Sequence, residues 1–405
     1  MTFGPRLSAR ALVSAMRHQH WLTIAIGLTI AARVVVFAAS IVWPIPNERG
    51  APVSPLLPQT YFDFEFYLRS LKQYGGSWAD ILQTFADFYR TPLQNRLGML
   101  ISGPVFPALM TAFGFAGGNY LPLAVFYLVL GSVVAAAWLV WLHDMRVGGG
   151  WLVVFAVLPN PIWFVLVVSP DLLFAAGFAA FFLAYFSRST SRTQTIVWIT
   201  ALILVVLTRP NSFSVVLFVA LDVSWSFLRE RRIAPSRALG LTALLVISGL
   251  YLYPYFVAEM SKAGTVLPYF GLTASQYLSG AFSALPHWLD LAVSWVALLG
   301  AKLLYLTGLR PSYGVTEPLL VFVRAAQGAV LLPGLVALLL IAPLRERLLV
   351  GLYCLPFLLG PSQDRYLLAI YPLLFVYGTR FWSAMARRAV GRHRNPPTTI
   401  GAERT

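Results

Sequence analysis

Residues 119–142, with the sequence NYLPLAVFYLVLGSVVAAAWLVWL, contain no charged side chain. About 20 consecutive apolar residues cross the hydrocarbon core of a bilayer when they form an α-helix, so this stretch is long enough to span one. Similar stretches recur along the chain, which is 58% hydrophobic and only 11% charged. A water-soluble protein of this length needs a more polar surface. The sequence therefore predicts that the bilayer surrounds most of this chain.

The apolar stretches predict an all-α fold, a polytopic transmembrane helical bundle of about 10–12 spans. Eleven candidates are present, but an odd number would place the two arginine-rich ends on opposite sides of the membrane. We therefore expect ten or twelve spans, with the segment 291–309 miscounted. One membrane domain should cover 1–380, followed by a basic tail over 381–405. The candidate spans are 21–43, 119–142, 151–168, 171–187, 195–209, 211–228, 238–257, 291–309, 318–341, 346–360 and 366–378.

The chain carries a formal net charge of +15, but its basic residues are spread over short loops and both ends. This distribution argues against a nucleic-acid surface and favours an orientation signal, because positively charged loops remain in the cytoplasm. The predominance of arginine over lysine suggests a bacterial source. We expect a multi-pass protein of the bacterial inner (plasma) membrane. The arginines expected on the cytoplasmic side are Arg6, Arg10, Arg17, Arg188, Arg192, Arg229, Arg231, Arg232, Arg237, Arg380, Arg387, Arg388, Arg392 and Arg394.

The segment 44–118 after the first span is rich in acidic residues and should form a long extracytoplasmic loop. Within it, 79–90 places apolar side chains on one helical face, which predicts an interfacial helix. Asp63 and Glu65 stand among aromatic residues that include Tyr67. Partial desolvation raises a carboxyl pKa toward the range of a general base, so this pair is a candidate for proton abstraction. An aromatic belt with two solvated acids is the alternative.

Three further polar sites are predicted at the outer ends of spans. Asp171 lies at a tight turn, where a carboxylate near hydrocarbon is expensive unless it has a role, although Ser169 or Asp171 could simply cap the next helix. Arg209 can pair with phosphate oxygens, whereas a snorkelling arginine would prefer the cytoplasmic end. Arg365 opens the last span and could instead be neutralised by Asp364.

Several short motifs occur in a fixed order along the chain. An acid, an aromatic residue and a glycine turn follow the first span; a Pro-x-x-Pro element, a Ser-x-acid turn, a Thr-Arg-Pro-Asn element and an Arg-Tyr…Pro element come next. In this order they resemble the GT-C superfamily of polyprenyl-phosphate-sugar-dependent glycosyltransferases, most closely bacterial relatives of the GPI mannosyltransferase II (PIG-V-like) family. The residues that carry the resemblance are Asp63, Tyr67, Tyr74-Gly75-Gly76, Pro104-Val105-Phe106-Pro107, Ser169-Pro170-Asp171-Leu172-Leu173-Phe174, Thr208-Arg209-Pro210-Asn211 and Arg365-Tyr366 through Pro372.

The resemblance implies an enzyme of GT-C type, a hexosyl- or mannosyltransferase that works on the extracytoplasmic face. The donor would be a sugar on a polyprenyl monophosphate, and the acceptor a lipid-linked glycan, a polysaccharide or a protein. Asp63 would be the catalytic base of an inverting displacement, with Arg209 and Arg365 on the leaving phosphate and Lys262, Lys302 and Arg310 as alternatives. The remaining substrate-binding candidates are Glu65, Tyr67, Asp171, Asn211 and Tyr366.

No cofactor beyond the lipid-linked donor is required by this hypothesis. A divalent cation could bridge Asp63 and Glu65 to phosphate, but further ligands are not evident, so metal dependence stays open. Two other functions remain: a flippase or transporter of lipid-linked sugars, which predicts charges at mid-membrane depth, and a non-catalytic membrane scaffold. The bilayer, the lipid-linked donor and the acceptor are the expected partners; nucleic acid is not.

Overall fold

The structure is a computed structural model, and it describes most of the predicted helical segments. The described residues are 9–46, 52–56, 79, 80, 83, 86, 103–114, 118–187, 191–209, 212–230, 242, 245, 246, 248–250, 252, 286–309, 318–359 and 364–394. Apart from a two-residue antiparallel hairpin, β1 (Ile45–Pro46) with β2 (Pro52–Val53), the regular structure in these ranges is helical. The all-α prediction is confirmed to this extent.

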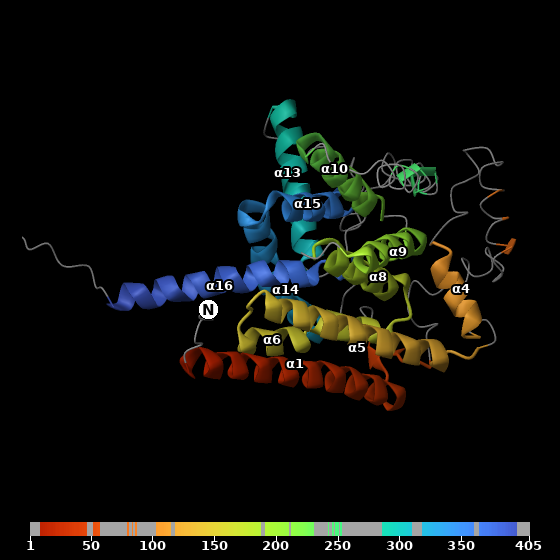
Figure 1. Ribbon diagram of the computed structural model, residues 1–405, viewed down its shortest axis with the longest axis horizontal. Helices are drawn as coiled ribbons and strands as arrows, with labels where there is room; N and C mark the ends of the chain where they lie inside the picture. Colours follow the sequence, from red (N-terminus) through yellow and green to blue (C-terminus); the bar gives the residue numbers. More distant parts are fainter. Residues whose placement is uncertain are drawn as a thin grey trace, which may run out of the picture.

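The helices of the first half form a layered group around one long N-terminal helix. This helix, α1, packs against α5, α6 and α7, while α8 and α9 form a hairpin beside α5 (Figure 1). The hairpin pairs closely along its length because it joins two apolar helices by a short connection. The bounds are α1 Ala9–Val42, α4 Val105–Ala112, α5 Leu121–Asp144, α6 Gly149–Ala156, α7 Pro159–Leu166, α8 Pro170–Tyr185 and α9 Arg192–Thr208.

The second half adds helices that cross this group at several angles. α14 and α16 pack tightly together, α10 packs on α15, and α13 stands across the direction of α1 and α5 (Figure 1). The N-terminal end of α1 and the C-terminal end of α16 lie on the same side of the molecule. The bounds are α10 Phe213–Glu230, α13 His287–Leu306, α14 Pro318–Ile341, α15 Leu344–Leu359, the short 3-10 helix η5 Asp364–Leu367 and α16 Tyr371–Arg394.

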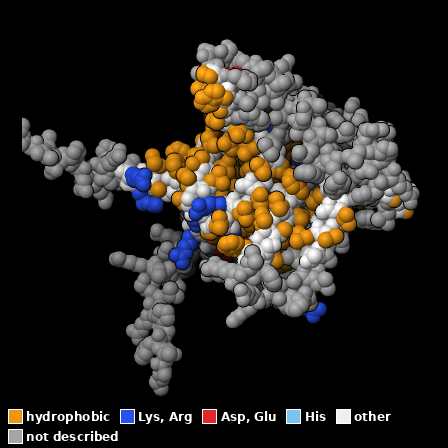
Figure 2. All heavy atoms as spheres, turned by 90° about the horizontal axis from the view of Figure 1, so that it is seen from above, with side chains coloured by type: hydrophobic (Ala, Val, Ile, Leu, Met, Phe, Trp, Pro, Cys, Tyr) orange, Lys and Arg blue, Asp and Glu red, His pale blue; other side chains and the backbone are white. Residues whose placement is uncertain are grey.

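Three of the described helices are long and apolar enough to cross a membrane: 19–42 within α1, α5, and 321–341 within α14. Shorter apolar segments lie in α8, α9, α10 and α13. Large apolar side chains on these helices face outward; Val133 is 60% exposed and Phe322 is 71% exposed. Figure 2 shows a face on which hydrophobic side chains dominate the described surface, as expected for contact with lipid.

Aromatic side chains fill the interior between α5, α8 and α10. Trp138 of α5 contacts Phe182 of α8 with ring centroids 5.5 Å apart, and Phe186 stacks on Phe218 of α10 at 6.0 Å. Phe178 and Phe182 are fully buried. Aromatic pairs of this kind bury large areas, and they fix the position of α8 between its neighbours.

One predicted span is interrupted in the structure. The predicted span 151–168 is two short helices, α6 and α7, because Pro159 lacks an N–H group and the residue before it, Leu158, is extended with ψ 127°. The segment of the last predicted span, 366–378, contains the end of η5 and the start of α16, and α16 continues as a helix to Arg394. The alanines and arginines of this region favour a helix.

The segment 291–309, which we expected to be miscounted, is largely helical as α13, and the described residues 296–306 form an apolar helical segment. In the predicted interfacial helix 79–90, the described residues Ala79, Asp80, Gln83 and Ala86 are helical.

Candidate functional site

The α8–α9 hairpin brings two of the predicted site residues into direct contact. Asp171 lies in the first turn of α8, and Arg209 follows the last residue of α9, so both stand at the same end of the hairpin. Arg209 Nη2 lies 2.9 Å from Asp171 Oδ1. The Asp171 side chain is 3% exposed, and the Arg209 side chain is 15% exposed. This is a buried ion pair, which persists only because each charge compensates the other.

Helix capping does not explain Asp171. The N-cap of α8 is Ser169, followed by Pro170 at the first helical position as expected, but the Ser169 side chain makes no capping hydrogen bond. The snorkelling alternative for Arg209 also fails, because its side chain is buried against Asp171 rather than extended along the helix surface. A carboxylate at a helix N-terminus is favoured by the helix dipole, which adds to the ion pair.

The helix η5 adds Arg365 and Tyr366 to the same site. The guanidinium carbon of Arg209 lies 5.3 Å from the centroid of the Tyr366 ring, and that of Arg365 lies 5.4 Å from it. Both distances suit cation–π contacts. Phe357 of α15 stacks on the Tyr366 ring with centroids 4.8 Å apart. Arg365 itself is 8% exposed.

Two buried tyrosines hold the backbone of the site in place. The hydroxyl of Tyr127 in α5 donates to the Ser169 carbonyl at 2.6 Å, and the hydroxyl of Tyr353 in α15 donates to the Tyr366 carbonyl at 2.6 Å. α5 and α15 therefore support the two halves of the site.

The backbone just before α4, at Gly103, contacts the backbone at the end of α9. The Gly103 N–H donates to the Thr208 carbonyl at 3.2 Å. A Cβ atom at Gly103 would lie 2.0 Å from the Leu207 carbonyl oxygen, so only glycine allows this approach. This contact places the predicted Pro-x-x-Pro element, which begins at Pro104, next to Arg209.

Three buried polar atoms near the ion pair have no hydrogen-bond partner in the part of the chain that the structure describes. They are Asp171 Oδ2, Ser169 Oγ and Ser212 Oγ. Ser169 and Ser212 are fully buried, and Asp171 is nearly so. The Ser212 N–H donates to the Arg209 carbonyl at 3.1 Å, which ties this serine to the arginine. Such atoms are unusual in folded proteins and call for an explanation.

Four predicted site residues thus come together: Asp171, Arg209, Arg365 and Tyr366. The other predicted residues, including the proposed base, lie outside the described residues: Asp63, Glu65, Tyr67 and Asn211, with the alternatives Lys262 and Arg310. Lys302, the remaining alternative, is buried within α13. No group of three potential metal-ligating His, Cys, Asp or Glu side chains occurs among the described residues.

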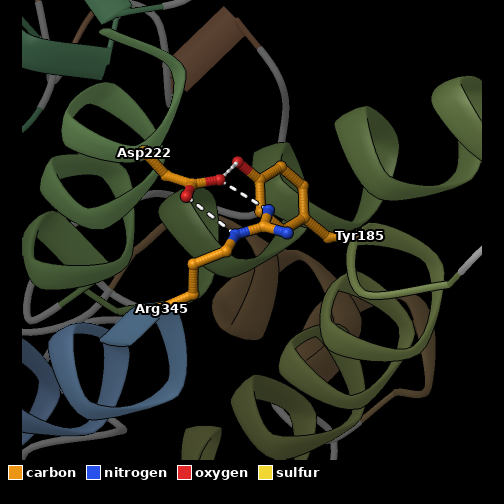
Figure 3. A network of polar contacts seen from close by, with 3 residues as sticks. All are labelled: Tyr185, Asp222 and Arg345. Atoms are coloured by element: carbon orange, nitrogen blue, oxygen red, sulfur yellow. Dashed lines mark hydrogen bonds and ion pairs between the residues drawn. The ribbon is translucent and has the colours of Figure 1, made fainter. Parts of the chain in front are cut away.

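A second polar network was not predicted from the sequence (Figure 3). Arg345, at the start of α15, donates from Nε to Asp222 Oδ1 at 2.8 Å and from Nη2 to Oδ2 at 2.6 Å. The Tyr185 hydroxyl at the end of α8 donates to Asp222 Oδ2 at 2.6 Å. The Arg345 guanidinium also lies 5.2 Å from the Phe186 ring. Asp222 in the apolar α10 was the available signal, because a charge there requires a partner.

A buried arginine in the first span was also missed. Arg33 is 2% exposed, and its Nη1 donates to the Thr29 carbonyl at 2.9 Å and also to the Thr29 hydroxyl. Thr29 in turn donates to the Ala156 carbonyl, 3.0 Å away at the end of α6. Arg33 is therefore a buried charge within the first apolar span, 19–42.

No known protein family, curated protein or solved structure matches this chain.

Proposed function

We propose that this chain is an integral membrane glycosyltransferase of GT-C type that moves a hexose or pentose, such as mannose, from a polyprenyl monophosphate to a glycan, lipid or protein acceptor. One observation carries this proposal: Asp171, Arg209, Arg365 and Tyr366, which lie in three separate segments of the sequence, meet at one end of the α8–α9 hairpin. Buried charges beside apolar helices are expensive, and in membrane proteins they mark functional sites.

The site should face the extracytoplasmic side of a bacterial inner membrane. Arginines concentrate near the ends of the chain, and the N-terminal end of α1 lies on the same side as the C-terminal end of α16 (Figure 1). Lys and Arg side chains gather toward the side on which α16 ends (Figure 2). These features support a cytoplasmic location for both ends and hence an even number of spans, ten or twelve.

In the proposed reaction the acceptor hydroxyl attacks the anomeric carbon of the donor sugar. Asp63 takes the proton of that hydroxyl as the new C–O bond forms. The bond from the anomeric carbon to the phosphate oxygen breaks, and polyprenyl phosphate leaves with the electron pair, so that the configuration inverts. The charge that develops on the phosphate needs a cation nearby. Arg365 is our candidate for this role, because its guanidinium group lies beside the same Tyr366 ring as that of Arg209, while Arg209 is paired with Asp171.

A transporter of lipid-linked sugars is the second candidate, and Arg33 is the observation that favours it. This arginine is buried within the first apolar span, next to the break between α6 and α7. Charges at mid-membrane depth and interrupted helices are typical of transporters. The Thr29 hydrogen bonds, however, also give Arg33 a structural role at the carbonyl end of α6.

The experiment that separates these functions is sugar transfer in reconstituted vesicles. Radiolabelled polyprenyl-phosphate sugars are supplied to the wild-type chain, to Asp63→Asn and to Asp80→Asn, a control aspartate in the same loop. The glycosyltransferase proposal expects transfer from one donor, lost in Asp63→Asn and kept in Asp80→Asn. Movement of labelled lipid between leaflets without transfer would establish the transporter instead.

A further inference from the structure

The charges of the Asp171–Arg209 pair indicate whether this end of the α8–α9 hairpin suits a phosphate or an uncharged ligand. Asp171 Oδ1 lies 2.9 Å from Arg209 Nη2, and both side chains are largely buried. A phosphate bound at Arg209 would bring its negative charge next to the Asp171 carboxylate, and like charges at such distances repel strongly in a low dielectric. The pair as a whole is neutral, and this favours an uncharged, hydrogen-bonding ligand.

The atoms without partners around this pair have the chemistry that such a ligand needs. Asp171 Oδ2 accepts hydrogen bonds only, whereas the hydroxyls of Ser169 and Ser212 can both donate and accept. A buried polar atom without a partner destabilises the fold, and a ligand that supplies the missing hydrogen bonds removes this penalty. Sugar hydroxyls donate and accept in the same way, so they can satisfy all three groups.

We propose that Asp171, held by Arg209 and flanked by Ser169 and Ser212, forms a neutral subsite that binds the hydroxyls of a sugar ring. This inference rests on the proposed glycosyltransferase function and deepens it. The sugar-binding task belongs to the Asp171–Arg209 pair, and the phosphate-binding task falls to other cations of the site, with Arg365 next to the shared Tyr366 ring. Arg209 then acts as a positioning residue for Asp171.

The test compares two lipids that differ only in the sugar. Binding of polyprenyl phosphate and of polyprenyl-phosphate sugar is measured for purified chain in nanodiscs, using the donor that transfers in the vesicle assay. Asp171→Asn should weaken binding of the sugar-bearing lipid roughly 10- to 100-fold, the effect of losing a hydrogen bond to a charged group. Binding of the bare polyprenyl phosphate should change less than about threefold.

Asp222→Asn is the matched control. Like Asp171, Asp222 is a buried aspartate that pairs with an arginine, but it lies in α10, near the end of α8 that is farther from Asp171. The variant should leave the affinities for both lipids unchanged even if it lowers the stability of the chain. Ser212→Ala is the second test variant. Because the Ser212 hydroxyl has no partner in the described part of the chain, its removal should not reduce the unfolding temperature, yet it should weaken binding of the sugar-bearing lipid.

The sugar can come from the donor or from a glycan acceptor, and the same variants distinguish them. If the variants bind the polyprenyl-phosphate sugar more weakly, the subsite holds the sugar of the donor. If they bind this donor normally but show a higher KM for the acceptor, the subsite holds a sugar of the acceptor. Equal weakening of both lipids by Asp171→Asn would mean a phosphate role and overturn the inference, as would no change in any of these quantities. If the wild-type chain binds neither lipid, the proposed function itself fails.

Discussion

The close packing of α14 on α16 gives a prediction whose size follows from the structure. A Cβ atom at Gly334 would lie 2.0 Å from the Leu374 carbonyl oxygen, and one at Gly378 would lie 2.3 Å from the Val330 carbonyl oxygen. Real Cβ atoms essentially never approach other atoms within 3.0 Å. Gly334→Ala therefore forces the two backbones apart by about 1 Å at this point. Helices in membranes associate largely through such close contacts between small residues.

The expected loss is about 1–3 kcal/mol, the usual effect of adding a methyl group to a packed interior. A gap of this size also removes a quarter to a half of the attraction between the separated atoms. Gly351→Ala in α15 is the control, because a Cβ atom there has no neighbour within 4 Å. Alanine in place of an open helical glycine should stabilise by roughly 0.5–1 kcal/mol.

The assay is unfolding of the purified chain by sodium dodecyl sulfate in mixed micelles, followed by tryptophan fluorescence. Gly334→Ala should unfold at a lower detergent fraction than the wild type, and Gly351→Ala at the same or a higher one. The Gly378→Ala variant should resemble Gly334→Ala. The double variant should lose less stability than the sum of the two single losses, because moving α14 away from α16 once relieves both contacts. Equal stability of Gly334→Ala and Gly351→Ala would refute the packing of α14 on α16.

Three further predictions concern the polar contacts. In a double-mutant cycle, Asp222→Ala and Arg345→Ala should show a coupling energy of about 1–2 kcal/mol, reduced from that of a fully buried pair because Arg345 is 52% exposed; additive losses would exclude the ion pair. Gly103→Ala should lower sugar transfer at least tenfold through displacement of the end of α9, whereas Gly150→Ala, with no atom within 4 Å of its Cβ position, should not; equal activities would contradict the close approach. Tyr353→Phe should destabilise by about 1 kcal/mol, measured in the same micelle assay, because the hydroxyl loses its bond to a backbone carbonyl, and an unchanged midpoint would count against that bond.

The helices themselves were largely determined by local sequence. Long apolar runs form helices in a bilayer because every backbone N–H and C=O group must find a partner within the segment. The predicted 119–142 and 318–341 correspond closely to α5 and α14. The break at Pro159 was also encoded locally, although the uniform hydrophobicity of 151–168 concealed it.

The candidate site was predictable in part, because its residues have chemical properties that are unusual at their positions. Asp171, Arg209 and Arg365 are charges at the ends of apolar stretches, and each therefore indicated a special role. Their mutual arrangement was not predictable. The sequence gives no distance between Asp171 and Arg209 or between Arg209 and Tyr366, since these depend on how α8, α9 and η5 pack.

Sequence alone thus determined that this chain is apolar, helical and suited to a membrane, because hydrophobicity and backbone hydrogen bonding act over a few neighbouring residues. Only the tertiary structure decided which charges meet. Asp222 and Arg345 lie 123 positions apart, and their pairing, like that of Asp171 with Arg209, results from helix packing that no local pattern specifies. A buried charge predicts that a partner exists, because its desolvation must be compensated, but the fold chooses the partner.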